Sequence, residues 1–224
     1  MKFLKLVMIV GAVALFMSPA LKAGTVTFSF SDCTEITSPL GKCPPQNVDM
    51  GTNHVTYKSG GLTLDAWGFT TGGSAEHLYV KNLGTDETGL GTIIDSADHE
   101  ITPDDFVSLD LSNLVANGIF SGILQIQSLQ AGEGYKICQG SSVSAFGTAP
   151  CVPSHGTGLG TANVPITWTA LTDVIGIMGF DDPTAGADVL VSSLKVDTPE
   201  PATLSLLGMG LFGLASLRRR MIKN

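Results

Sequence analysis

Residues Thr25–Phe30 read TVTFSF, in which Val26, Phe28 and Phe30 alternate with hydroxyl side chains. A period of two places the apolar side chains on one face of an extended chain, which is the pattern of a half-buried β-strand. Similar short runs recur along the chain, separated by Gly, Asn, Asp and Pro. They predict strands at Thr25–Phe30, Val55–Lys58, Leu62–Phe69, Leu78–Lys81, Phe106–Leu111, Ile123–Leu129, Tyr135–Gln139, Ile166–Ala170, Val174–Phe180 and Val189–Val196.

The spacing of these strands decides the fold class. No stretch between residues 24 and 197 has the period of an amphipathic helix, and only Asn113–Phe120 favours a short turn. Roughly ten short strands at hairpin spacing are typical of two antiparallel sheets packed face to face. The sequence therefore predicts an all-β domain over residues 24–197, a two-sheet β-sandwich of jelly-roll type.

The residues before the first strand have the layout of a secretory signal peptide. Lys2 and Lys5 precede an apolar run over Leu6–Phe16, and small residues follow. Cleavage after Ala23 would release a chain that begins directly with the first strand. An uncleaved anchor is the alternative, but the apolar run is short for a bilayer. We therefore predict a signal peptide at residues 1–23 and export of the rest.

Export predicts that the cysteines of this chain form disulfides. An oxidising compartment favours disulfides, and four thiols allow three pairings. Pairing of neighbours in sequence would close two short loops rich in Pro or Gly. A zinc site is the alternative, but the close Cys-x₂₋₄-Cys spacing is missing. We expect disulfides among Cys33, Cys43, Cys138 and Cys151.

Charge is distributed unevenly along the chain. The formal net charge is -8. Both ends are basic, whereas residues 24–198 contain five lysines, no arginine and nineteen acidic residues, a net charge of -14. Such a field repels nucleic acid, so nucleic-acid binding is excluded as a function class.

The last residues combine three features in a fixed order. A Pro-Glu-Pro triplet is followed by an apolar stretch over Ala202–Leu217 and then by an arginine cluster. Sixteen helical residues would reach about 24 Å, slightly less than the hydrocarbon core of about 30 Å. The positive-inside rule places the arginines in the cytoplasm and the acidic domain outside. We expect a short transmembrane helix that inserts transiently.

This order resembles the PEP-CTERM sorting domain of bacterial exported proteins. The resemblance implies that residues 198–224 are a sorting tail, recognised by a membrane exosortase and removed. It further implies delivery to the cell surface, the outer envelope or the extracellular matrix, in bacteria that make exopolysaccharide. The motif residues are Pro199, Glu200, Pro201, Arg218, Arg219 and Arg220.

The domain itself resembles the body of a common type of PEP-CTERM protein. The resemblance implies a β-sandwich surface protein, and it implies neither an enzymatic activity nor a ligand. It is carried by Leu78–Asn82, Asp86–Gly91, His99–Ile101, Phe106–Leu111 and Leu129–Glu133.

An acidic cluster is the main candidate ligand site. Six acids fall within sixteen residues that contain no Lys or Arg, and Glu87 lies close in sequence. A hard cation such as Ca²⁺ would relieve their repulsion. The EF-hand spacing is absent, and a solvated acidic loop is the alternative. The candidate calcium ligands are Asp95, Asp98, Glu100, Asp104 and Asp105.

No catalytic residues are predicted. The sequence contains neither a G-x-S-x-G elbow nor an H-E-x-x-H pair. We expect a non-enzymatic structural or adhesive protein. The alternatives are a carbohydrate- or calcium-binding module and, less favoured, a polysaccharide hydrolase with paired carboxylates. Five aromatic residues are an alternative platform for binding sugars, although packing in the core is the favoured role. They are Trp67, Trp168, Tyr57, Tyr79 and Tyr135.

Overall fold

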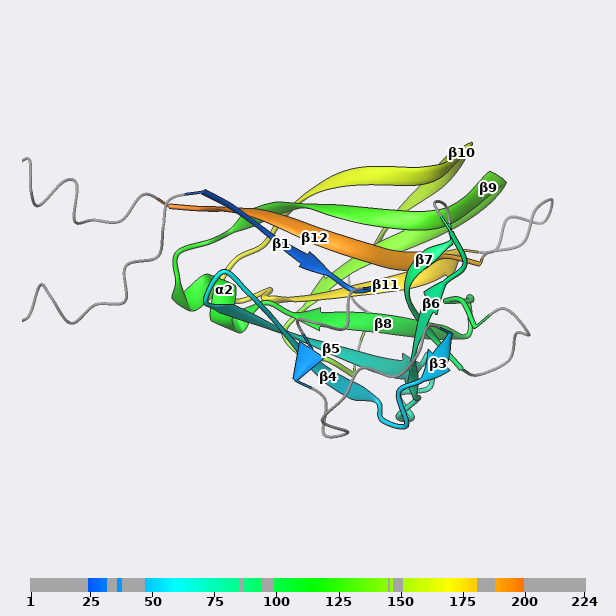
Figure 1. Ribbon diagram of the computed structural model, residues 1–224, viewed down its shortest axis with the longest axis horizontal. Coiled ribbons are helices and arrows are strands. Elements are labelled where there is room, and N and C mark those ends of the chain that lie inside the picture. The colour runs from blue at the N-terminus through cyan, green and yellow to red at the C-terminus, as the bar shows by residue number, and fades with distance from the viewer. Residues whose placement is uncertain are drawn as a thin grey trace, which may run out of the picture. The chain divides into compact units, whose positions relative to one another are not determined.

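The computed structural model describes residues 24–31, 36–37, 47–84, 87–93, 99–144, 146, 151–180 and 188–199 (Figure 1). Strands dominate these residues, and paired strands are antiparallel throughout. The strands are β1 (Gly24–Ser29), β2 (Ile36–Thr37), β3 (Val48–Asp49), β4 (His54–Ser59), β5 (Leu62–Thr70), β6 (Leu78–Asn82), β7 (Thr88–Thr92), β8 (Asp105–Asp110), β9 (Ser121–Gly140), β10 (Cys151–Thr167), β11 (Val174–Phe180) and β12 (Leu190–Thr198). A short helix, α2 (Ser112–Ala116), overlaps the predicted turn at Asn113–Phe120.

Two sheets are joined by the long strand β9. The first sheet has the order β2-β4-β5-β8-β11-β9, and the second runs β9-β12-β7-β6-β3 with β1 added on β12. β9 pairs with β12 through Gly122–Gln127 and with β11 through Gly134–Gly140. Figure 1 shows β12 and β1 on one side and β5 and β8 on the other. The predicted all-β, two-sheet fold is confirmed, and two predicted strands prove to be the two halves of β9.

A bulge marks the point where β9 passes from one sheet to the other. Leu129 is paired with Gly160 and Gln127 with Thr161, so Ser128 has no partner in the ladder. Its φ of 62° is in the left-handed region, which is uncommon for a residue other than glycine. An extra residue bends a strand and turns its side chain in a new direction. At Ser128 that bend lets one strand serve both sheets.

The alternating apolar residues form the core between the sheets. Phe28 and Phe30 of the first predicted strand are fully buried. On β5, Leu62, Leu64 and Ala66 are each at most 1% exposed. Period-two side chains from both sheets thus meet in one interior.

A second apolar cluster lies on the other face of the first sheet. Phe69 of β5 contacts Phe106, with ring centroids 5.6 Å apart, and Phe106 meets Phe146 edge to face at 5.4 Å. Phe146 belongs to the segment between β9 and β10, and a disulfide joins Cys138 to Cys151 across that segment. An added Cβ at Gly176 would come within 2.8 Å of the Phe146 ring, so only glycine allows this approach.

The predicted processing segments, residues 1–23 and the tail beyond Pro199, lie outside the described residues, as do Cys33 and Cys43. Residues Thr25–Asp197 form one compact unit. The domain boundaries given above therefore remain predictions.

Candidate functional site

The acidic cluster divides into residues with different surroundings. Glu100 and Asp105 are buried, at 4% and 0% exposure, whereas Asp104 is exposed. Asp95 and Asp98 lie outside the described residues. A solvated loop would leave all its carboxylates in water, so the burial of two of them requires partners.

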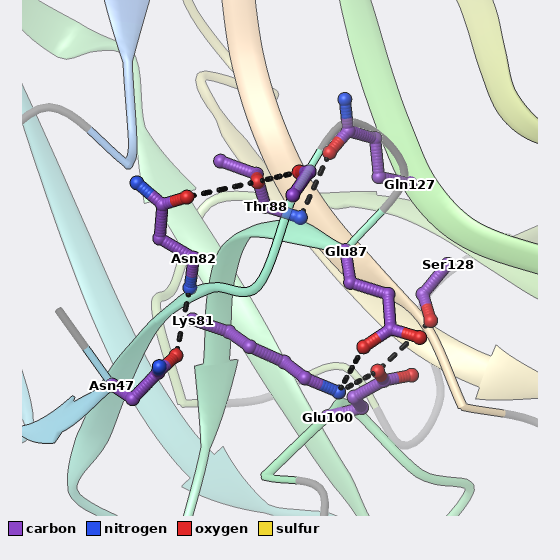
Figure 2. A network of polar contacts seen from close by, with 9 residues as sticks. Asn47, Lys81, Asn82, Glu87, Thr88, Glu100, Gln127 and Ser128 are labelled. Atoms are coloured by element: carbon purple, nitrogen blue, oxygen red, sulfur yellow. Dashed lines mark hydrogen bonds and ion pairs between the residues drawn. The ribbon is translucent and has the colours of Figure 1, made fainter.

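Lys81 is the partner of Glu100, and it comes from a different strand. Its ammonium Nζ lies 2.5 Å from Oε1 of Glu100 and 3.2 Å from Oε2 of Glu87. Ser128 Oγ donates a hydrogen bond to the same Glu100 oxygen at 2.8 Å. Figure 2 shows the Lys81 side chain reaching between the two carboxylates. The bulge in β9 is thus what aims the Ser128 hydroxyl into this network.

The energetics of this network depend on burial. The side chains of Lys81 and Glu100 are 5% and 4% exposed, while that of Glu87 is 47% exposed. Burial raises the pKa of Glu100, and the hydrogen bonds from Lys81 and Ser128 oppose this. For Lys81, burial disfavours the charge, but hydrogen bonds and attraction from Glu100 and Glu87 prevail and raise its pKa. The pair therefore keeps a cation in the interior.

Further hydrogen bonds connect the hairpin of β6 and β7 to its neighbours. The backbone N–H of Thr88 donates to Oε1 of Gln127 at 3.0 Å, and that of Asn82 donates to Oδ1 of Asn47 at 2.9 Å (Figure 2). These contacts hold β7 against β9 and β6 beside β3. The network around Lys81 is therefore a junction between several strands.

Asp105, by contrast, accepts hydrogen bonds from neutral donors of the described residues. Its Oδ1 accepts the backbone N–H of Thr102 at 2.6 Å, and its Oδ2 accepts the hydroxyl of Thr92. Burial raises the pKa of Asp105 to about 6, against the opposing effect of these hydrogen bonds. The group therefore titrates close to neutral pH.

These contacts bear on the proposed calcium ligands. Oε1 of Glu100 and both carboxylate oxygens of Asp105 already accept hydrogen bonds. Among the described residues, no three His, Cys, Asp or Glu side chains come together as a metal site. The calcium site predicted at Asp95, Asp98, Glu100, Asp104 and Asp105 stays a prediction. The pairing of Glu100 with Lys81 was not foreseen, because no basic residue lies in the acidic segment itself.

The five aromatic residues considered as a sugar platform are mostly interior. Trp168 is 3% exposed, and its indole N–H donates to the carbonyl of Ile119 at 2.9 Å. Tyr57 is fully buried, and burial raises its pKa above the ordinary range. Trp67 is stacked by His54 at 3.9 Å. Tyr79 and Tyr135 are 9% and 4% exposed.

A groove opens along β10, bounded by the second half of β9. It has a volume of about 380 Å³, and its lining contains no charged side chain. Val152 and Val164 of β10 line it together with Ile137 and Tyr135 of β9. Sequence reasoning gave no sign of this groove, because the first half of β10 is rich in Gly, Pro and Ser.

The first and last strands meet where the domain ends. The backbone N–H of Gly24 donates to Oγ1 of Thr198 at 3.0 Å, and that hydroxyl donates to the Gly24 carbonyl at 2.8 Å. A comparison with known protein families matches the PEP-CTERM protein-sorting motif to residues 197–220. The chain carries a PEP-CTERM sorting motif. The match thus begins on the last two residues of β12.

The PEP-CTERM motif confirms the resemblance drawn from Pro199–Pro201 and the arginine cluster. It implies an exported protein that is sorted at the membrane by an exosortase. No helix of the described residues is long and apolar enough to cross a bilayer. The transmembrane helix predicted at Ala202–Leu217 lies outside them.

Comparisons beyond the PEP-CTERM motif add little. No curated protein matches the sequence. A solved structure, the K1 cleaved adhesin domain of Lys-gingipain from Porphyromonas gingivalis W83, is 14% identical over 78% of this chain and 95% of its own, with a TM-score of 0.28. A likeness this weak carries no argument about fold or function.

Proposed function

We propose that this protein is a non-enzymatic structural or adhesive component of the cell surface or extracellular matrix, and that its β-sandwich is the part delivered there. The observation that carries the proposal is the position of the sorting motif. It starts at residue 197, on the final strand, so no further domain lies between the sandwich and the tail. The sandwich is therefore the cargo that the tail sorts.

The use of the buried ionisable groups supports a structural role. Lys81 neutralises Glu100, and Thr92 and Thr102 satisfy Asp105. Each of these groups joins strands to one another, and none projects into the groove. A catalytic acid or base must reach a substrate atom, often from a cleft. Groups held in this way stabilise the sheet rather than perform chemistry.

The arrangement of the ends also suits a sorted cargo. β12 has partners on both sides, because it pairs with β9, β7 and β1. A tail held in the membrane would pull on this strand along its length, against hydrogen bonds on both of its edges. Such a strand resists extraction better than an edge strand. The folded domain can therefore remain intact while an exosortase processes the residues after it.

The mass of the mature protein tests the proposal. We expect protein from the cell surface and medium to begin at Gly24 and to end after Thr198. The triple variant Pro199→Ala, Glu200→Ala, Pro201→Ala should keep the tail and stay with the membrane fraction. Lys195→Ala, an exposed position on β12 before the motif, is the matched control and should mature normally. Full-length protein in the cytosol would overturn the proposal.

A second experiment addresses the absence of enzymatic activity. The purified protein is incubated with the exopolysaccharide of the producing cells, and both sugar release and co-sedimentation are measured. We expect no release of reducing ends. Turnover that is lost on changing a single carboxylate would establish a hydrolase, and co-sedimentation without turnover would support the matrix role.

A further inference from the structure

The groove along β10 is a feature that the proposed function leaves unused. It has a volume of about 380 Å³, within the range of small-molecule sites. One wall comes from β9 and the other from both halves of β10. The lining includes Tyr135, Ile137, Gln139, Val152, Val164 and Ile166.

The groove exists because β10 is the last strand on its side of both sheets. β10 pairs only with β9, so nothing covers its outer edge among the described residues. Val152 is paired in register with Ile137, and Val164 with Leu124. Since paired residues share a face of the sheet, both valines belong to the interior face. Yet Val152 is 71% exposed. The interior of the sandwich is thus open to solvent at this edge.

The charge of the lining narrows the class of ligand. Acidic residues outnumber lysines nineteen to five over residues 24–198, but no charged residue lines the groove. Neither a cation nor an anion would find a counter-charge there. Most of the lining residues are Ile, Val or Pro, and one polar contact marks an end of the groove, where Gln139 Nε2 donates to the Thr167 carbonyl at 2.6 Å. This pattern complements an uncharged chain with a small polar head.

Two other occupants fit less well. A peptide strand added to β10 would need its free N–H groups, but Pro153 and Pro165 have none. A sugar would need an open aromatic face and several hydroxyl partners, whereas Tyr135 is 4% exposed.

We propose that this groove binds an uncharged aliphatic chain, such as the alkyl or acyl chain of a neutral lipid. The aliphatic chain of the ligand lies between Ile137 and Ile166, with its polar head near Gln139 and Thr167. Burial of apolar surface drives the binding. An exported protein that is sorted at a membrane meets such chains during its maturation.

The probe for this site is 1-decanol, titrated into the exported protein and followed by methyl NMR. We expect saturable shifts at Ile137, Val152 and Val164. Ser154→Trp fills the groove and should weaken binding by about tenfold or more. Val152→Trp is the second blocking variant, because a side chain that is 71% exposed is not needed for folding. Leu83→Trp, at another exposed aliphatic position, is the matched control and should bind normally.

Two further titrations sharpen the result. Decanoate has the same chain with a charged head, so it should bind more weakly than decanol in this acidic domain. Maltose should produce no shifts at these methyl groups. The proposal would be overturned if decanol did not saturate the site or if both blocking variants bound decanol as tightly as the wild type. It would also be overturned if maltose, and not decanol, shifted these methyl groups.

Discussion

Glu100 and Asp105 are two buried carboxylates from the same segment of the chain, and they have been accommodated in different ways. Glu100 accepts an ammonium group and a hydroxyl, from Lys81 and Ser128. Asp105 accepts hydrogen bonds from neutral groups, among them the Thr102 backbone N–H and the Thr92 hydroxyl. Burial raises the pKa of both. The difference is that the Lys81 ammonium stabilises the charged form of Glu100, whereas burial stabilises the protonated form of Asp105.

The comparison shows that burial alone does not decide what a carboxylate contributes. A paired acid makes the fold depend on its partner, because removing the cation leaves a buried charge. An unpaired acid makes the fold depend on pH instead. Three substitutions separate these two kinds of dependence.

Lys81→Met should have the largest effect. It leaves Glu100 in the interior without its cation, and breaking a buried pair in this way costs about 3–5 kcal/mol. Urea unfolding followed by tryptophan fluorescence measures the loss of free energy. The double variant Lys81→Met, Glu100→Leu removes both charges and should recover a large part of it. If the single variant lost less than about 1 kcal/mol, the pair would not hold the hairpin of β6 and β7 as described.

Asp105→Asn should change the pH dependence of stability. The pKa of Asp105 is about 6 in the fold and 3.8 ordinarily. Between these values the folded state binds more protons than the unfolded state, so stability falls as pH rises from about 4 to about 6. A difference of two units corresponds to roughly 3 kcal/mol. The asparagine variant lacks this fall and should be the more stable protein at pH 7.

Unfolding free energies of the wild type and Asp105→Asn, measured across this pH window, give the check. Asp104→Asn changes an exposed neighbour and serves as the control, with a slope like that of the wild type. Parallel curves for Asp105→Asn and the wild type would show that Asp105 is not the titrating group.

Glu87→Gln should have the smallest effect. Its carboxylate also lies near Lys81, but the side chain is 47% exposed. Solvent screens such a pair, so the change should cost no more than about 0.5 kcal/mol, and less at high salt. A loss as large as that of Lys81→Met would mean that Glu87, and not Glu100, is the main counter-ion.

The strands of this fold follow from the sequence wherever one face is buried. The run Val174–Phe180 coincides with β11, and Leu62–Phe69 with nearly all of β5. Alternation reports burial of one face, which is why it finds these strands and the class of the fold. It does not report that the runs Ile123–Leu129 and Tyr135–Gln139 form one strand, because the polar and glycine-containing residues 130–134 interrupt the alternation within β9.

Other elements carried no such signal. β10 is rich in Gly and Pro, which are depleted in strands, and it is a strand because β9 supplies its hydrogen bonds. β7 reads TGLGT, and its glycines allow close approach of other backbone: an added Cβ at Gly91 would lie 2.2 Å from the carbonyl of His99. Tertiary contacts override local preference in both cases.

The same reasoning applies to the candidate site. The acidic cluster was evident in the sequence, but its counter-ion Lys81 comes from β6, and only the fold brings it to Glu100. The pairing of Cys138 with Cys151 was the local one among three combinations, and it is present. The sorting motif was the easiest feature to find, because a membrane signal is written as a linear order of residues.

The position of β12 has a consequence for the timing of biogenesis. Among the strands of the described residues it is the last to be synthesised, yet it lies inside the second sheet, where it joins β1, β7 and β9. That sheet cannot close until residue 198 has crossed the membrane, and at that moment the apolar tail is next to enter the translocation channel. The domain therefore completes its folding at about the time when the sorting signal reaches the membrane. The exosortase then acts on a domain that has only just folded.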